Sequence, residues 1–389
     1  MKTSIHRFFD FLRAGAVALL LAACGGGVET GGTGATGGSY VEGPITGFGS
    51  IIVAGVRFDD SSAIVEDSGR GSSSDNLRLG MRVEVESGVI TDDGSGGRAA
   101  TATRVRFASD LIGPVTTADA AGLQIGVIGQ PVRVTVATVI EGAPGGAASL
   151  VIGDIVEVHG FPSTVGYVAT RIERRTSAPA TFRVRGIVSD LTATPPTLRI
   201  GSQTFDLAAT GVPAGLANGQ LVRLTVSTVQ VAGRWPVTAI TAESRRVDDR
   251  DEAEVEGLIT ALVSATRFVV NGIAVDAGAA TIRGSLVLGA RVKVRGRSVG
   301  GEVVASTVEV RSDDDAFGEG VDLRGEIANF NSSAQTFELR GVVVFYDNNT
   351  EFKDGDVGNL ANTKRVRVRG KLSPERTRVI AERIEFSSP

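Results

Sequence analysis

Gly43-Pro44-Ile45-Thr46 opens a stretch of sequence that returns four more times, at a pitch of about seventy residues. The leading glycines of the five copies are Gly43, Gly113, Gly186, Gly257 and Gly325. A second landmark precedes a valine-rich run in each copy: Leu79-Gly80, Ile152-Gly153, Asn218-Gly219, Leu288-Gly289 and, without the glycine, Asn362-Thr363. A third landmark, such as Ala102-Thr103-Arg104-Val105, closes each copy. Several landmarks repeated in one order predict a tandem array of similar small domains.

The repeated segments read as strands. Arg365-Val366-Arg367-Val368-Arg369 and Val132-Arg133-Val134-Thr135-Val136 place every second side chain on one face, which is the period of a half-buried strand. The runs are short and lie between Gly, Asn, Asp and Ser, the usual turn formers. We therefore expect roughly five or six strands per copy and no long helix after the N-terminus.

A domain of this size hides its sheet edges either as a closed barrel or as a two-layered sandwich. The glycine-rich segment Thr46-Gly47-Phe48-Gly49-Ser50 suits a strand that bends at a barrel corner, which favours closure. An OB-like barrel has the right size. We expect barrel interiors to contain Phe48, Phe58, Phe268, Phe337 and Phe352, although Phe48 between its glycines is also a candidate for presenting a ring to a ligand.

The predicted organisation is all-β, with five tandem OB-like β-barrel domains after an N-terminal segment whose ending, Leu21-Ala22-Ala23-Cys24, resembles that of a lipoprotein signal peptide. The expected segments are a signal peptide at 1–23, a Gly-rich tether at 24–39, and barrels at 40–109, 110–180, 181–247, 253–311 and 320–386. Arranged end to end, five such units would extend to about 150 Å, since each has an expected diameter near 30 Å.

The N-terminal residues resemble a bacterial lipoprotein signal. Lys2, Arg7 and Arg13 precede a short apolar run that ends in Leu21-Ala22-Ala23-Cys24-Gly25. The run is too short to span a bilayer. The resemblance implies cleavage before Cys24 and a thioether-linked diacylglycerol on that cysteine, with a further N-linked acyl chain. An ordinary secretory signal with a chance cysteine is the alternative.

Lipidation also accounts for cysteine usage, because Cys24 is the sole cysteine and a disulfide needs two. Several acyl chains would anchor the protein firmly to a membrane. Gly25, rather than Asp, at the next position resembles the signal for the outer membrane. We expect an outer-membrane lipoprotein at the periplasmic face.

Few residues offer catalytic chemistry. His159 is the one histidine after the signal and lies on the outward phase of a strand, where we expect a structural or incidental role. One histidine and no free cysteine exclude Cys–His, Ser–His–Asp and His/Cys zinc sites. A Ser–Lys or paired-carboxylate enzyme stays formally open. We expect no catalytic residue and no cofactor.

Acidic residues gather at two junctions between copies. Asp248 and Asp249 lie at the first, and Asp313, Asp314 and Asp315 at the second. Clustered carboxylates are calcium ligands, but the spacing matches no complete calcium loop, and like charges also keep a linker extended. We expect linkers rather than metal sites.

The net charge of −4 and an aromatic content of 5% argue against nucleic-acid binding, which needs a basic groove with stacking rings. The many outward arginines are expected to form a solvated face.

Residues 43–58, with Leu79-Gly80-Met81-Arg82-Val83-Glu84-Val85, resemble a family of uncharacterised proteobacterial lipoproteins with tandem OB-like repeats, a domain of unknown function. The first copy carries the resemblance best, and the fifth departs at Thr363, where a different turn is expected. The resemblance implies β-barrels in the envelope and brings no catalytic residues. We expect a non-catalytic scaffold or binding array with an envelope protein or a glycan as partner. The alternatives are an OB-like module that binds glycans or other oligomers and, least favoured, an envelope hydrolase.

Overall fold

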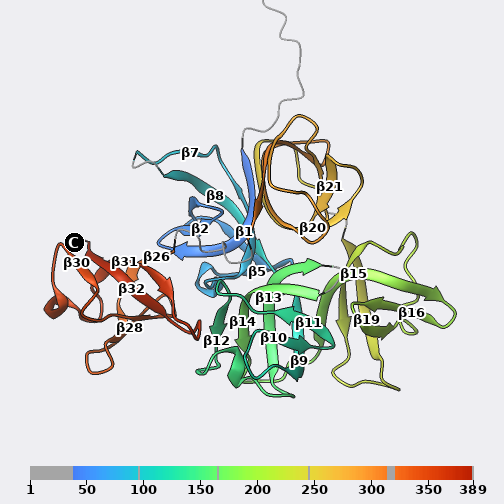
Figure 1. The fold of residues 1–389 in the computed structure, drawn as a ribbon, viewed down its shortest axis with the longest axis horizontal. Helices are drawn as coiled ribbons and strands as arrows, with labels where there is room; N and C mark the ends of the chain where they lie inside the picture. The colour runs from blue at the N-terminus through green and yellow to red at the C-terminus, as the bar shows by residue number, and fades with distance from the viewer. Residues whose placement is uncertain (1–37, 95–96, 164–165, 244–245, 313–319, 388–389) are drawn as a thin grey trace, which may run out of the picture. The chain divides into compact units, whose positions relative to one another are not determined.

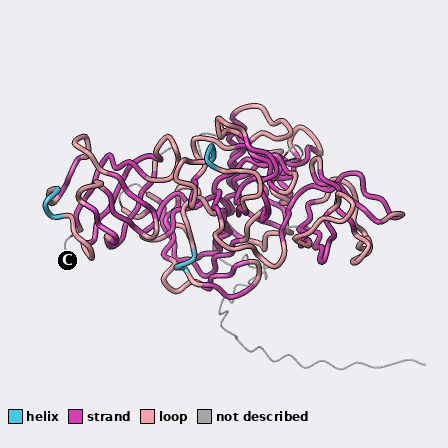
Figure 2. The backbone as a smooth tube through the Cα atoms, turned by 90° about the horizontal axis from the view of Figure 1, so that it is seen from below, coloured by secondary structure: helices cyan, strands magenta, loops and turns pink. Residues whose placement is uncertain are grey.

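The computed structural model describes residues 38–94, 97–163, 166–243, 246–312 and 320–387. The predicted signal peptide, Cys24, most of the tether, and Asp313 to Asp315 lie outside these ranges. The described chain is built from strands, with only short 3-10 turns between some of them (Figure 2). Among the described residues, no helix is long and apolar enough to cross a membrane.

Barrel 1 shows how each unit closes. Its five main strands are β1 (Ser39–Phe48), β2 (Ile51–Val53), β3 (Val56–Asp59), β6 (Arg82–Ser87) and β8 (Arg98–Phe107). β1, β2 and β3 form an antiparallel meander, β3 runs parallel to β8, and β6 pairs antiparallel with both β8 and β1. The order first-second-third-fifth-fourth-first is that of an OB-fold barrel. Smaller elements decorate it: β4 (Ile64–Asp67), β5 (Arg70–Ser72), η1 (Ser74–Asn76) and β7 (Thr91–Asp92).

The same strand order closes the other four units. The colours of Figure 1 follow these units along the chain. Barrel 2 contains β9 (Leu111–Ala118), β10 (Gln124–Val127), β11 (Gln130–Arg133), β12 (Val139–Glu141), η2 (Ala147–Ser149), β13 (Ile155–Ser163) and β14 (Gly166–Arg174). Barrel 3 contains β15 (Phe182–Ala193), β16 (Pro196–Ile200), β17 (Gln203–Asp206), β18 (Leu221–Val226) and β19 (Trp235–Glu243).

Barrel 4 contains β20 (Arg250–Leu262), β21 (Arg267–Val270), β22 (Ile273–Asp276), β23 (Thr281–Arg283), β24 (Arg291–Val299) and β25 (Glu302–Arg311). Barrel 5 contains β26 (Val321–Glu326), β27 (Ala328–Asn331), β28 (Thr336–Leu339), β29 (Val342–Phe345), β30 (Glu351–Lys353), η4 (Val357–Asn359), β31 (Arg365–Leu372) and β32 (Val379–Phe386). The predicted fold class, an all-β chain of tandem small OB-like barrels, is confirmed.

The second landmark is one turn, repeated in all five barrels. Its backbone N–H donates to the first strand over 2.8–2.9 Å in each copy, at Gly80, Gly153, Gly219, Gly289 and Thr363. All five residues have positive φ, a conformation that glycine adopts without steric cost. Thr363 has a φ of 72°, so the expectation of a different turn in the fifth copy is wrong. The hydrogen bond holds the threonine in the glycine conformation.

The apolar cores follow the inward phase of the strands. Phe48, Phe58, Phe268 and Phe337 are buried as predicted, and Phe352 packs at the edge of the same core as Phe48. Burial of Phe48 leaves no ring there for a ligand. One core cluster joins barrels 1 and 5, and another joins barrels 2 and 3. Neighbouring barrels therefore share apolar packing.

The barrels are also joined by backbone pairing. β1 runs parallel to β20 of barrel 4 and, at its other end, to β26 of barrel 5. β9 of barrel 2 pairs with β15 of barrel 3. Gly47 permits one of these contacts, because a Cβ there would lie 2.3 Å from the carbonyl oxygen of Asp322. Barrel 1 therefore bonds directly to barrels that are distant in sequence.

Candidate functional site

Charged residues on the outward faces of the first and fourth main strands distinguish one barrel from another. These positions are cross-strand neighbours in each barrel, and their charges differ. In barrel 1 they are acidic: Tyr40, Glu42, Glu84 and Glu86. In barrel 3 they are basic: Arg183, Arg185, Arg223 and Thr225. In barrel 4 they are mixed, Glu254, Glu256, Lys293 and Arg295, and in barrel 5 mainly basic, Asp322, Arg324, Arg367 and Arg369.

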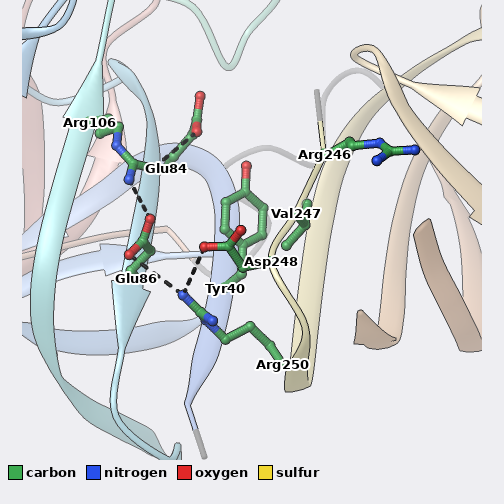
Figure 3. A pocket seen from close by; sticks show the side chains of 8 residues that line it. All are labelled: Tyr40, Glu84, Glu86, Arg106, Arg246, Val247, Asp248 and Arg250. Atoms are coloured by element: carbon green, nitrogen blue, oxygen red, sulfur yellow. Dashed lines mark hydrogen bonds and ion pairs between the residues drawn. The ribbon is translucent and has the colours of Figure 1, made fainter. Parts of the chain in front are cut away.

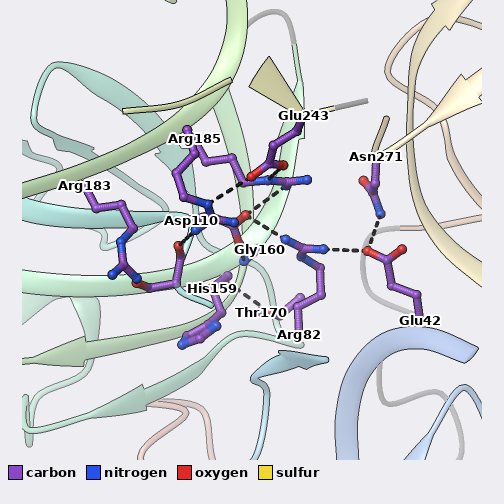
Figure 4. A network of polar contacts seen from close by, with 12 residues as sticks. Glu42, Arg82, Asp110, His159, Gly160, Thr170, Arg183, Arg185, Glu243 and Asn271 are labelled. Carbon is purple, nitrogen blue, oxygen red and sulfur yellow. Dashed lines mark hydrogen bonds and ion pairs between the residues drawn. The ribbon is translucent and has the colours of Figure 1, made fainter. Parts of the chain in front are cut away.

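Asp110 lies at the centre of the site formed by these charges (Figure 4). It comes just before β9 and is fully buried. One carboxylate oxygen accepts from Arg82 of barrel 1 at 2.9 Å and from Arg185 of barrel 3 at 3.1 Å. The other oxygen accepts from the backbone N–H of Gly160 at 2.9 Å. A single carboxylate of barrel 2 thus joins three barrels.

The network continues on both sides of Asp110. Arg82 also donates to Glu42 at 2.5 Å, and Glu42 lies 3.4 Å from the side-chain amide of Asn271 in barrel 4. On the other side, Arg185 donates to Glu243 at 2.7 Å, and Glu243 accepts from Arg223 at 2.9 Å. We call this set, with Asp110, the interbarrel network. It contains side chains from barrels 1 to 4.

The interbarrel network holds its central acid ionised. Burial alone would raise the pKa of Asp110, but the positive charges of Arg82 and Arg185 and the Gly160 N–H lower it to about 2. Burial raises the pKa of the neighbouring Tyr167, so that phenol stays protonated. Neither Asp110 nor Tyr167 therefore exchanges a proton near neutral pH. The ionised Asp110 attracts the arginines of barrels 1 and 3 and so connects these barrels to barrel 2.

His159 lies beside this network, on the outward face of β13 as predicted, yet it is buried. Its cross-strand neighbour Arg171 donates to the carbonyl oxygen of Leu79 in barrel 1 at 3.2 Å, so this side of barrel 2 is covered. The imidazole Nε2 lies 3.5 Å from Glu157. Burial would raise the pKa of Glu157, but His159 and Arg175 lower it to about 2.

A polar pocket of about 310 Å³ lies between barrel 1 and the segment that enters barrel 4 (Figure 3). Its lining side chains are mostly charged: Tyr40, Glu84, Glu86, Arg106, Arg246, Val247, Asp248 and Arg250. Arg106 bonds to Glu86, while Arg250 lies 3.7 Å from Glu86 and 3.6 Å from Asp248. The pocket is therefore lined by acids and bases that neutralise one another.

The acidic junction residues that the structure describes do not converge. Asp248 is mostly exposed and contacts Arg250, whereas Asp249 accepts from the backbone N–H of Gly300 at 2.7 Å. No group of three or more His, Cys, Asp or Glu side chains that could hold a metal occurs in the described part of the chain.

Sequence reasoning missed the interbarrel network. Outward arginines were expected to be solvated, but Arg171 and Arg185 are almost fully buried, so that expectation is wrong for them. The available signal was the change of charge between equivalent strand positions. Where equivalent outward positions of two copies have opposite charges, the two copies can attract each other at those positions.

A domain of unknown function (DUF5666) is similar to three segments of this chain. Its family model matches residues 112–173, 256–309 and 324–385, which lie in barrels 2, 4 and 5 and make up less than half of the chain. Barrel 1, where the sequence resemblance was expected to be best, is not among the matched segments. No curated protein matches the chain.

A solved structure described as "drosophila Unr CSD456" is 15% identical in sequence. The similarity covers 52% of this chain and 97% of that one, with a TM-score of 0.14. The fold assignment rests on the strand order of the barrels.

Proposed function

We propose that this protein is a non-catalytic scaffold of the cell envelope. The observation that carries the proposal is the interbarrel network, in which Asp110 and its arginines connect barrels 1 to 3 and the contact between Glu42 and Asn271 adds barrel 4. Removing one partner from such a network leaves an uncompensated buried charge in the assembled protein, so a variant that lacks one of these arginines should hold its barrels together less firmly. The protein would then present the outer surfaces of its barrels in a fixed arrangement to an envelope protein or a glycan.

The membrane anchor of this scaffold is Cys24, acylated after cleavage of residues 1–23. The support is the Leu21-Ala22-Ala23-Cys24 sequence and the lack of any other cysteine. Mass spectrometry of the mature N-terminus tests the anchor: we expect acyl chains on Cys24. An unmodified Cys24 or an intact signal would remove both the anchor and the outer-membrane location at the periplasmic face.

Partner retention tests the scaffold. Wild-type mature protein on a support should retain an envelope protein or peptidoglycan, and Arg82→Ala should retain less, because the barrels lose their fixed arrangement. Arg383→Gln is the matched control, since Arg383 lies on an exposed face and pairs with Glu351 within barrel 5. Equal retention by both variants would contradict the scaffold.

The second candidate is an OB-like module that binds a small glycan, favoured by the polar pocket beside Tyr40. Its volume is at the lower end of ligand sites, which span roughly 300–1,000 Å³. The Tyr40 ring is nearly buried and offers no stacking platform. Stoichiometric binding of an oligosaccharide, lost in Arg250→Ala, would favour this candidate over the scaffold. We expect nucleic acid not to bind, because the net charge is −4.

A further inference from the structure

Four arginines of barrels 1 and 5 lie around one carboxylate. On β31, Arg367 and Arg369 occupy alternate outward positions opposite Arg324 and Asp322 of β26. Arg57, on β3 of barrel 1, reaches the same place because β1 pairs with β26. We call Arg57, Arg324, Arg367 and Arg369 the arginine cluster.

Asp322 is the carboxylate that this cluster shares. It accepts two hydrogen bonds from Arg367, at 3.0 and 2.6 Å, and one at 3.5 Å from Arg57. Arg369 lies 3.9 Å away. Burial would raise the pKa of Asp322, but the Arg367 hydrogen bonds and the charges of Arg367 and Arg57 lower it. Asp322 is therefore an anion with −1 charge among four cations.

The cluster has donors that Asp322 does not satisfy. The Nη1 of Arg57 and the Nε of Arg324 are buried and have no hydrogen-bond partner among the described residues. Burial and repulsion from Arg57 and Arg367 lower the pKa of Arg324. Glu385 and Asp93 also attract Arg367. A buried donor without a hydrogen-bond partner lowers the stability of the folded state. A second anion that accepts from these donors would therefore stabilise the arginine cluster.

Barrel 3 shows what the equivalent positions look like when they are neutralised. There Arg185 and Arg223 occupy the same cross-strand pair as Arg324 and Arg367 in barrel 5. Arg185 bonds to both Asp110 and Glu243, and Arg223 bonds to Glu243. In barrel 3 two carboxylates accept hydrogen bonds from this pair of arginines, whereas in barrel 5 the Nε of Arg324 has no partner among the described residues and Arg367 shares Asp322 with Arg57.

We propose that the arginine cluster is a binding site for a phosphate group. Arginine binds phosphate through paired N–H donors in a fixed fork, and the cluster supplies such donors from two barrels. A phosphomonoester carries about −1.5 to −2 charges near neutral pH, which offsets the positive charge of the cluster better than a single carboxylate does, whereas a phosphodiester carries one negative charge. The Arg369 side chain is 51% exposed, so a ligand can approach from solvent.

Calorimetric titration of the full mature chain in detergent tests the site. Inorganic phosphate represents a free anion, and glycerophosphoglycerol represents the head group of an anionic phospholipid. Binding of either probe supports the site, and the tighter probe identifies the source of the phosphate. We expect Arg324→Gln to weaken binding roughly tenfold or more, because a charged hydrogen-bond donor is lost.

Arg365→Gln is the matched control. Arg365 lies on the same strand, but it is mostly exposed and pairs with Glu326 outside the cluster. This variant should bind within about twofold of wild type, the difference expected for a distant surface charge. Thermal unfolding gives a second readout: Arg324→Gln should not lower the melting temperature without ligand, because like-charge repulsion is relieved, and should lose the rise that phosphate gives wild type. Absence of binding to wild type, or equal weakening by both variants, would overturn the proposal.

Discussion

At the scale of single residues, position 363 shows how tertiary contacts override local preference. Asn362-Thr363 lacks the glycine of the other copies, and the sequence alone suggested another turn. The structure keeps the turn, because the N–H of Thr363 donates to the carbonyl oxygen of Ile327 at 2.8 Å. A β-branched residue at positive φ is strained, so this turn stores energy that a glycine would release.

We predict that Thr363→Gly stabilises the protein by about 1 kcal/mol, because relief of backbone strain exceeds the added chain entropy of the unfolded state. Thr363 is exposed, so little packing is lost. Chemical denaturation measures the change. Thr363→Ala is the control and should gain less, since alanine retains a Cβ. A less stable glycine variant would show that the threonine side chain itself supports the turn.

Asp110 gives a pH dependence with a definite sign. Its folded-state pKa, about 2, lies below the ordinary value of 3.8. Its contribution to stability is therefore complete above pH 3.8 and is lost as the pH falls toward 2. The size is roughly 2 kcal/mol. Glu157, also near 2, adds to the same acid limb.

Denaturation of wild type at a series of pH values from 5 to about 2 should show this loss. Asp110→Asn should be less stable than wild type at pH 5 and show a shallower acid limb. Asp248→Asn is the control, since Asp248 is mostly exposed, and should follow the wild-type curve. A wild-type stability that does not fall with acidification would contradict the ionised state of Asp110.

At the scale of elements, the strands and their closure were predictable, because the period of two and the repeated turns are local properties. The docking of one element on another barrel was not. Leu79-Gly80 in barrel 1 packs against β14, where a Cβ on Gly80 would lie 2.5 Å from the carbonyl oxygen of Thr170. The equivalent Gly289 has open space around it. Leu79-Gly80 and Leu288-Gly289 have the same sequence, and only the structure shows that the first contacts another barrel whereas Gly289 does not.

This difference provides an internal control. Gly80→Ala and Gly289→Ala both place alanine at positive φ, and this strain should lower the free energy of unfolding by about 1–3 kcal/mol in each variant. Gly80→Ala should cost about 1–3 kcal/mol more, because its methyl group overlaps barrel 2. Chemical denaturation of both variants measures the difference. Equal losses would show that barrel 1 moves away from β14 without penalty.

At the scale of the whole molecule, the repeat predicted separate units, but the outward charges decide how the units associate. The local sequence pattern is the same for an outward arginine in water and for an outward arginine that pairs with a carboxylate of another barrel. Asp110 meets its arginines only when barrels 1, 2 and 3 pack together, and Glu42 meets Asn271 only when barrel 1 packs against barrel 4. The candidate site therefore could not be predicted from one repeat, although the barrel that presents each charge could.

The sole tryptophan allows a direct test of coupling between barrels. Trp235 is buried in barrel 3, so its fluorescence reports that barrel, whereas far-ultraviolet circular dichroism reports all five. In wild type the two denaturation curves should coincide, because the interbarrel network and shared cores couple the barrels.

Arg82→Ala should cost about 3–5 kcal/mol, since Glu42 and Asp110 lose a buried partner, and should separate the two curves. Arg106→Ala, which removes a partly exposed arginine of barrel 1, should cost about 1 kcal/mol or less and leave the curves superimposed. Separate curves already in wild type would mean that the barrels unfold independently, and the rigid scaffold would then lose its physical basis.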